Sequence, residues 1–284
     1  MNLSILYRGP LSSCNYACEY CPFAKHVETQ SELAHDRECL ERFLGWCANR
    51  TQDQLGVLFT PWGEALVRRW YQDALVRLTN LPQFHKVAIQ TNLSCKLDWV
   101  ERCDKSKLAL WCTFHPTEST RQRFVAKCLE LIERGIRFSV GVVGLTEHIS
   151  EIEAIRRELP SGVYVWVNAY KREPDYYTAE MVEQLESVDP LFTFNNQYHA
   201  SLGEPCAAGS RVISVDGDGT IQRCHFIKQP IGNIYDANFA AALMERPCTN
   251  ATCGCHIGYV HLDRLQLSDT FGSGVLERIP LGYR

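Results

Sequence analysis

Three cysteines lie close together near the amino terminus, within the segment SSCNYACEYCPF. Cys14, Cys18 and Cys21 follow a C-x3-C-x2-C spacing. Thiolates are soft ligands that suit zinc or iron–sulfur clusters, and a loop this short can place three sulfurs around one metal centre. A four-iron cluster held by three cysteines keeps one iron without a protein ligand. The spacing therefore predicts a metal centre with one open coordination position.

A closed zinc site is the alternative interpretation of this segment. His26 follows Cys21 closely enough to complete a tetrahedral site with three cysteines and one histidine. Structural zinc sites more often use paired C-x2-C units, so the spacing favours the iron cluster over zinc. Both interpretations remain open from these residues alone.

The arrangement C-x3-C-x-aromatic-C, with Tyr20 before the last cysteine, resembles the cluster loop of the radical S-adenosylmethionine (SAM) enzymes. The resemblance implies a 4Fe-4S cluster on the three cysteines whose open iron binds SAM, with Tyr20 beside it. It also implies that an electron from the cluster cleaves SAM to a 5′-deoxyadenosyl radical, which abstracts hydrogen from a substrate. In such enzymes the cofactor carries out the difficult chemistry, and the protein positions the reacting groups and tunes the electronic properties of the cofactor. A flavodoxin-like or other low-potential electron donor is expected as a partner.

Residues at later strand ends are similar to SAM-contacting residues of that family. Pro61-Trp62-Gly63-Glu64 resembles its GGE motif with a tryptophan at the first glycine, which implies that Gly63 and Glu64 bind the SAM ammonium. Asn92 is similar to residues that bind the ribose, and Thr113 to the hydroxyl residue that meets the carboxylate. A helix-terminal role for Glu64 and a turn-capping role for Asn92 are the structural alternatives.

Further candidates come from weaker similarities. Arg121 or Arg123 could assist at the carboxylate, although each could equally be a solvated surface residue. Val142, in a partial match to the family's GxIxGxxE segment, could pack on adenine, and Asn168 could face adenosine or substrate. Cys112 could face the radical as a catalytic hydrogen donor, with core packing as the alternative.

Apolar runs alternate with amphipathic segments through the first two thirds of the chain. Strands are predicted at 3–8, 55–60, 86–91, 108–114, 136–144 and 162–168, and helices at 36–50, 65–79, 97–103, 119–134, 149–159 and 178–187. Six such units predict an α/β fold with a parallel sheet, a partial (β/α)6 TIM-like barrel as in the radical SAM family. Functional residues of such sheets gather at the carboxyl ends of the strands.

A second set of cysteines follows residue 190, where the alternation stops. It comprises Cys206, Cys224, Cys248, Cys253 and Cys255, with a predicted β-hairpin between the first two. The order resembles the auxiliary-cluster modules called SPASM and twitch, which implies one auxiliary 4Fe-4S cluster on Cys206 and Cys224 with two of the later cysteines. Cys253 and Cys255 are favoured for these two places, with Cys248 as the alternative. A zinc ribbon is the competing interpretation, because four thiolates suit zinc equally well.

Two domains are therefore expected, a radical SAM partial barrel at 1–190 and a cysteine-rich β-hairpin module with a carboxyl-terminal tail at 191–284. A net charge of −4 over 284 residues argues against a nucleic-acid partner. No segment reads as a secretory signal or a membrane span, so a cytoplasmic location and no membrane partner are expected.

The resemblance leaves the substrate open between two classes. Relatives with such modules modify ribosomal peptides or proteins oxidatively, and some short ones dehydrogenate small molecules such as sugar or cyclitol alcohols. The first strand begins almost at Met1, so a separate partner would have to bind a leader peptide. A non-catalytic zinc or iron–sulfur scaffold is the rival of another class.

Overall fold

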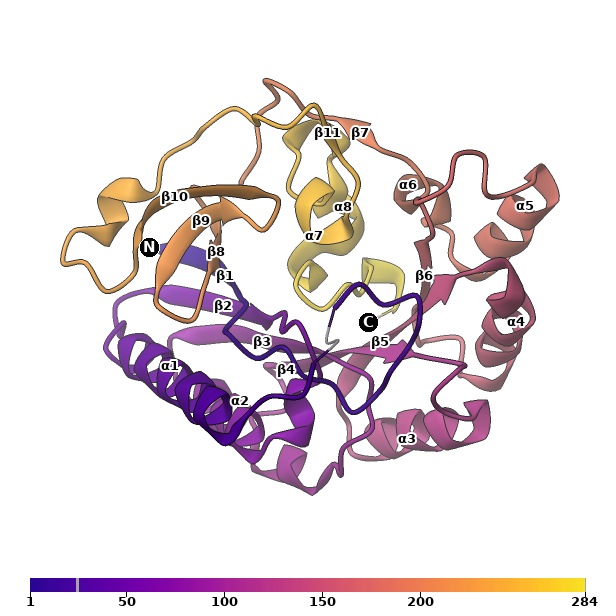
Figure 1. Cartoon of the computed structure of the whole chain (residues 1–284), viewed down its shortest axis with the longest axis horizontal. Helices are drawn as coiled ribbons and strands as arrows, with labels where there is room; N and C mark the ends of the chain where they lie inside the picture. The colour runs from indigo at the N-terminus through magenta and orange to yellow at the C-terminus, as the bar shows by residue number, and fades with distance from the viewer. Residues whose placement is uncertain (24–25, 284) are drawn as a thin grey trace.

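The computed structural model describes residues 1–23 and 26–283, and its centre is a curved sheet of parallel strands (Figure 1). Apolar, β-branched segments form the first six strands, each buried over most of its length. Their bounds are β1 Asn2–Tyr7, β2 Gln54–Phe59, β3 Phe84–Thr91, β4 Leu108–Phe114, β5 Arg137–Gly144 and β6 Val165–Ala169. Each pairs in parallel with the next, so their carboxyl ends meet at one edge.

Helices cover the outer side of this sheet in Figure 1. They are α1 Gln30–Ala48, α2 Arg69–Thr79, α3 Arg121–Glu133, α4 Ile149–Glu158 and α5 Ala179–Val188. The hydroxyls of Thr29, Thr120 and Thr178 cap the amino termini of α1, α3 and α5, and at Thr29 the side chain of Glu32 completes a capping box. The predicted helix at 97–103 is instead a short 3-10 helix, Asp98–Arg102. The predicted α/β fold with a parallel sheet is confirmed.

The main sheet continues past residue 190. Its nine strands run in the order β10-β9-β8-β1-β2-β3-β4-β5-β6. β8 Val212–Val215 pairs in parallel with β1, and β9 Thr220–Cys224 and β10 Ile227–Asn233 extend it antiparallel. The predicted hairpin is therefore β8–β9, and it lengthens the barrel sheet rather than standing apart from it.

Short elements make up most of the remaining carboxyl-terminal chain. They are α6 Phe192–Asn195, β7 His199–Ala200, β11 Thr252–Cys253, α7 His256–Tyr259 and α8 Leu267–Phe271. β7 pairs with β11 in a separate two-stranded sheet. In Figure 1, α7, α8 and the carboxyl-terminal end lie inside the curve of the main sheet, on the side opposite α1–α5.

Buried polar contacts fix this inner segment to the strands. The Glu277 carboxylate is fully buried, 2.6 Å from the Lys86 ammonium of β3 and 3.3 Å from the Arg137 guanidinium of β5. The Ser139 hydroxyl donates a hydrogen bond to the Glu277 carbonyl. Because Lys86 is only 5% exposed, the two charges depend on each other inside the barrel. Across the part of the chain that the structure describes, no helix is both long and apolar enough to cross a bilayer.

Candidate functional site

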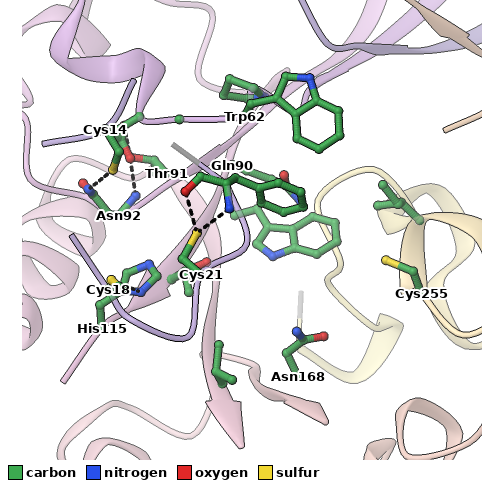
Figure 2. Close-up of a pocket in the computed structure, with 18 of the residues that line it drawn as sticks. Cys14, Cys18, Cys21, Trp62, Gln90, Thr91, Asn92, His115, Asn168 and Cys255 are labelled. Carbon is green, nitrogen blue, oxygen red and sulfur yellow. Dashed lines mark hydrogen bonds between the residues drawn. The ribbon is translucent and has the colours of Figure 1, made fainter. Parts of the chain in front are cut away.

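The loop that follows β1 opens onto a cavity of about 470 Å³ at the carboxyl ends of the strands (Figure 2). Cys14, Cys18 and Cys21 all line this cavity, which we call the barrel cavity. N–H groups point at two of the sulfurs: the Tyr16 amide donates to Cys14 Sγ at 3.4 Å and the Phe23 amide to Cys21 Sγ at 3.5 Å. Such donors stabilise thiolate ligands and tune the reduction potential of a cluster.

The loop after β2 is joined directly to the cysteine loop. The Trp62 amide donates to the Leu11 carbonyl at 3.2 Å, and the Glu64 amide donates to the Ser13 carbonyl at 3.0 Å. Between these bonds, Gly63 approaches so closely that a Cβ there would lie 1.8 Å from the Ser13 carbonyl oxygen. Glycine is therefore required at 63, because any side chain would push the two loops apart.

Replacing Gly63 by alanine should separate the cysteine loop from the loop after β2. We expect a loss of stability of about 1–3 kcal/mol, the usual cost of forcing a methyl group into closely packed atoms. Iron content after anaerobic reconstitution should fall with it. Urea unfolding and an iron assay check both effects. Gly45→Ala is the matched control, because nothing lies within 4 Å of a Cβ at that glycine. Equal iron content in the two variants would contradict the prediction.

Glu64 fixes the tip of β3 from the same loop. Its carboxylate is 2% exposed and accepts hydrogen bonds from the Leu66 amide, the Thr91 hydroxyl and the Asn92 amide at 3.0, 2.8 and 2.5 Å. Burial raises its pKa to about 7, although these three bonds oppose the shift. The Asn92 side-chain amide then reaches Cys14 Sγ at 3.8 Å. Glu64 therefore orients a side chain that contacts the cysteine loop.

A second cavity, of about 340 Å³, lies beside the first. All five late cysteines line it: Cys206, Cys224, Cys248, Cys253 and Cys255. Cys255 also lines the barrel cavity, where Figure 2 shows it across from the cysteine loop. We call the second space the cysteine cavity. The structure therefore gathers the second cysteine set beside the first.

Solved structures match this chain, although no family model and no curated protein does. Native anSMEcpe with bound AdoMet, which is SAM, matches with a TM-score of 0.56 at 14% identity, over 82% of this chain and 78% of that chain. Native anSMEcpe with bound AdoMet and Cp18Cys peptide matches with a TM-score of 0.55 at 12% identity, over 85% and 82%. The chain has the radical SAM fold.

A weaker match is BtrN in complex with AdoMet and 2-DOIA, at 14% identity over 86% of this chain and 87% of that chain. Its TM-score of 0.39 is too low to support any argument. At these identities the likeness to anSMEcpe establishes the radical SAM fold, and not the reaction.

Several residues predicted from the radical SAM resemblance do line the barrel cavity. They are Cys14, Cys18, Cys21, Gly63, Glu64, Asn92, Thr113 and Asn168. Tyr20 is not among the lining residues, but its hydroxyl contacts Nδ1 of His115, which does line the cavity, at 2.9 Å. The same His115 nitrogen is 3.3 Å from Cys18 Sγ. Tyr20 therefore contacts a residue of the cavity wall without lining the cavity itself.

Two apolar assignments need correction. Cys112 is fully buried in the main core, and burial together with Cys128 raises its pKa well above the ordinary thiol value. Val142 is also fully buried in that core, and its neighbour Val143 lines the cavity instead. Side chains alternate across a strand, so Thr113 faces the cavity and Cys112 faces away.

The two arginine candidates do not line the cavity. Arg121 pairs with Glu151 and Glu158, both at 2.7 Å, in an ion-pair network between α3 and α4. Arg123 is exposed near the start of α3. A SAM contact from Arg121 would require it to leave two carboxylates, so the surface alternative describes this residue.

Other cavity residues were not predicted as a site. They are Arg8, Trp62, Gln90, Trp111, His115, Trp166, His225, His256 and Arg278. The alternation of side chains along a strand could have predicted two of them. Trp111 lies on the same strand face as Thr113, and Trp166 lies on the same strand face as Asn168. Arg8 and Arg278 carry no such signal, because neither lies inside one of the strands.

The cysteine donors of the two cavities are thiols, which suit zinc and iron–sulfur clusters alike. Within 1–23 and 26–283, no three Cys, His, Asp or Glu side chains converge closely enough to hold one metal ion. His26, the fourth ligand of the zinc interpretation, is hydrogen bonded to the Ser12 hydroxyl at 3.2 Å. Burial raises the pKa of Cys14 to about 11, so its thiolate needs a cation beside it, which a metal centre would supply.

Proposed function

We propose that this chain is a radical SAM enzyme that oxidatively modifies a peptide or protein side chain. The observation that carries the proposal is the arrangement of Cys14, Cys18 and Cys21 on one wall of a cavity whose other walls carry the polar strand ends of a radical SAM fold. Three thiols leave a fourth position for SAM on a 4Fe-4S cluster. When bound there and reduced, the cluster supplies the electron that cleaves SAM to a 5′-deoxyadenosyl radical.

The residues of the chain would bind and orient SAM in this cavity. Backbone carbonyls around Gly63, held against the cysteine loop, would accept hydrogen bonds from the ammonium. The Thr113 hydroxyl and the Asn92 and Asn168 amides offer donors and acceptors to the carboxylate and ribose. The Glu64 carboxylate already accepts three hydrogen bonds from the protein. It would therefore support SAM binding indirectly, by positioning Thr91 and Asn92. Trp62, Trp111 and Trp166 give the cavity apolar walls that exclude water.

The cysteine cavity suits one auxiliary 4Fe-4S cluster, and its contacts favour Cys206, Cys224, Cys248 and Cys253 as ligands. Burial and then Cys248 raise the pKa of Cys206, and Cys206 and Cys248 add to the effect of burial at Cys224. At Cys253, burial raises the pKa to about 12, with further effects of Cys224, Cys255 and Cys248. Cys248 therefore interacts electrostatically with Cys206, Cys224 and Cys253, whereas an effect of Cys255 appears at Cys253.

Removing Cys248 should therefore abolish the auxiliary cluster, and removing Cys255 should not. The substitutions Cys248→Ala and Cys255→Ala are best compared in a chain that already lacks Cys14, Cys18 and Cys21. We expect about four irons per chain with Cys255→Ala and close to none with Cys248→Ala, because only the second substitution would remove one of the four proposed thiolate ligands. Iron and sulfide analysis after anaerobic reconstitution decides. Loss of iron with Cys255→Ala and its retention with Cys248→Ala would instead support Cys253 and Cys255 as the two late ligands, the choice favoured by the sequence.

Peptide modification is supported by the fold shared with anSMEcpe, whose structure holds a peptide. Dehydrogenation of a small molecule is the second candidate. Two features support it: the carboxyl-terminal segment that lies inside the curve of the sheet, and the volume of the barrel cavity. That volume, about 470 Å³, falls within the range of about 300–1,000 Å³ that suits small ligands.

For either substrate class, a flavodoxin-like donor would deliver electrons, and a separate protein could bind a leader peptide. We expect a reducing, cytoplasmic compartment, which agrees with the lack of disulfides among the cysteines of the described chain.

The test is release of 5′-deoxyadenosine. Anaerobically reconstituted protein, given dithionite and SAM, should release it, as measured by liquid chromatography. The zinc-loaded protein is the control and should release none. A metal-binding scaffold would hold iron and release no 5′-deoxyadenosine, and that result would refute the proposed function.

A further inference from the structure

Arg278 is a buried arginine on the wall of the barrel cavity. It is 3% exposed, and its guanidinium carbon lies 4.1 Å from the ring centre of Trp166 and 5.5 Å from that of Trp111. Its Nε has no hydrogen-bond partner, and no carboxylate of residues 1–23 and 26–283 forms an ion pair with it. A buried arginine is normally paired, because removing its charge from water is costly.

The acidic side chains nearest to Arg278 are already engaged. Glu277 pairs with Lys86 and Arg137. Asp189, whose carboxylate feels the charge of Arg278, accepts hydrogen bonds from the Tyr164 hydroxyl at 2.6 Å and from the Val167 amide at 2.9 Å. Asp189 therefore offsets part of the charge of Arg278, but of the described residues neither Asp189 nor Glu277 lines the cavity or forms an ion pair with the guanidinium.

Two further residues of the cavity wall, Arg8 and His256, each have one buried nitrogen without a hydrogen bond in the described chain, although Asp216 interacts electrostatically with Arg8. Arg8 lies over the Trp62 ring at 3.8 Å, and its Nε has no hydrogen-bond partner in the described chain. His256 is 3% exposed, and its Nε2 likewise has none. Glu64 is the one carboxylate among the residues that line the cavity, and it accepts three hydrogen bonds from the protein. Asp189 and Asp216, which interact electrostatically with Arg278 and Arg8, lie outside this lining, so no carboxylate of the described residues is ion-paired with either guanidinium at the cavity wall.

We propose that Arg278, assisted by Arg8 and His256, binds an anionic group of the substrate, a carboxylate or a phosphate. This inference rests on the proposed function, and it narrows the substrate class. A guanidinium that packs against two indole rings keeps its N–H groups available for hydrogen bonds, and its planar fork binds both oxyanions in a bidentate manner. Its orientation is set before the ligand arrives, which lowers the entropic cost of binding.

Calorimetry with simple anions tests the proposal. Inorganic phosphate and succinate are titrated separately into the anaerobically reconstituted protein with SAM present, and succinamide serves as the neutral probe. We expect one anion to bind per chain and succinamide not to bind. Arg278→Gln should weaken anion binding by about tenfold or more, the loss expected for one charge-assisted hydrogen-bonded pair. Arg278→Lys should retain part of the affinity, because it keeps the charge and loses the fork.

The control variant is Arg157→Gln, which changes an exposed arginine of α4 and should leave anion binding unaltered. Urea unfolding verifies that Arg278→Gln is folded. Whichever of phosphate and succinate binds more tightly identifies the group. Equal anion affinity in wild type and Arg278→Gln, no binding of either anion, or competition between the anion and SAM would each overturn the proposal, the last because Arg278 would then serve the cofactor. Absence of 5′-deoxyadenosine would refute the proposed function alone, since the calorimetry does not depend on turnover.

Discussion

Replacing Cys14, Cys18 and Cys21 together by alanine should abolish the release of 5′-deoxyadenosine and leave one cluster in place. The three thiols line the barrel cavity and the late cysteines line the neighbouring one, with Cys255 on both, so the two proposed clusters would have separate ligands. We expect the iron content to fall from about eight to about four per chain, the content of one 4Fe-4S cluster. Activity should fall to background, because without those ligands no open iron faces the cavity.

The matched control removes three other thiols. Cys39, Cys103 and Cys128 are buried outside both cavities, so their joint replacement by alanine should keep the full iron content. Iron and sulfide counts and liquid chromatography measure both effects. Continued 5′-deoxyadenosine release from the first triple variant would refute the assignment of its loop, and loss of all iron would show that the two cysteine sets depend on each other.

Replacing Glu277 by alanine should destabilise the chain by about 3–5 kcal/mol, the usual cost of removing one partner of a buried ion pair. The Lys86 ammonium, 5% exposed and 2.6 Å from the Glu277 carboxylate, would lose its counter-ion inside the barrel. The pair Lys86→Met and Glu277→Leu together should recover most of the loss, because the buried ammonium is removed with its counter-ion and Arg137, 35% exposed, stays in contact with water. The midpoint of urea unfolding measures each effect.

An exposed ion pair of equal length provides the comparison. Arg77 and Glu41 are also 2.6 Å apart, but their side chains are 49% and 48% exposed. Glu41→Ala should therefore change stability by less than about 1 kcal/mol. If Glu277→Ala were as mild as Glu41→Ala, the inner segment would not be held by this pair.

The sequence predicted the strands well because their signal is local. Each of β1–β6 lies within three residues of its predicted bounds at both ends, since each apolar run ends where polar residues begin. The same period-two alternation, applied to β4, separates Thr113 in the cavity from Cys112 in the core, and it would have excluded Cys112 as a catalytic candidate.

The insertion of the carboxyl-terminal segment could not be predicted in the same way. Glu277 and Arg278 have no periodic pattern around them, and their partners lie on strands more than a hundred residues earlier. Lys86 did offer a hint, because a lysine inside a strand buried on both faces requires a counter-ion. The sequence does not say which of the acidic residues supplies it. Arg278, which lines the cavity, was therefore not predicted, because the position of its segment was not predicted either.

The parallel pairing of β8 with β1 also constrains how the protein is made. Ser4 pairs with Val212, so roughly two hundred residues must be synthesised before the second edge of β1 is covered. Until then the first strand of the nascent chain presents unpaired N–H and C=O groups, the template on which chains aggregate or exchange strands. High yields in a fast-translating host should accordingly depend on chaperones that shield this edge, whatever the supply of iron.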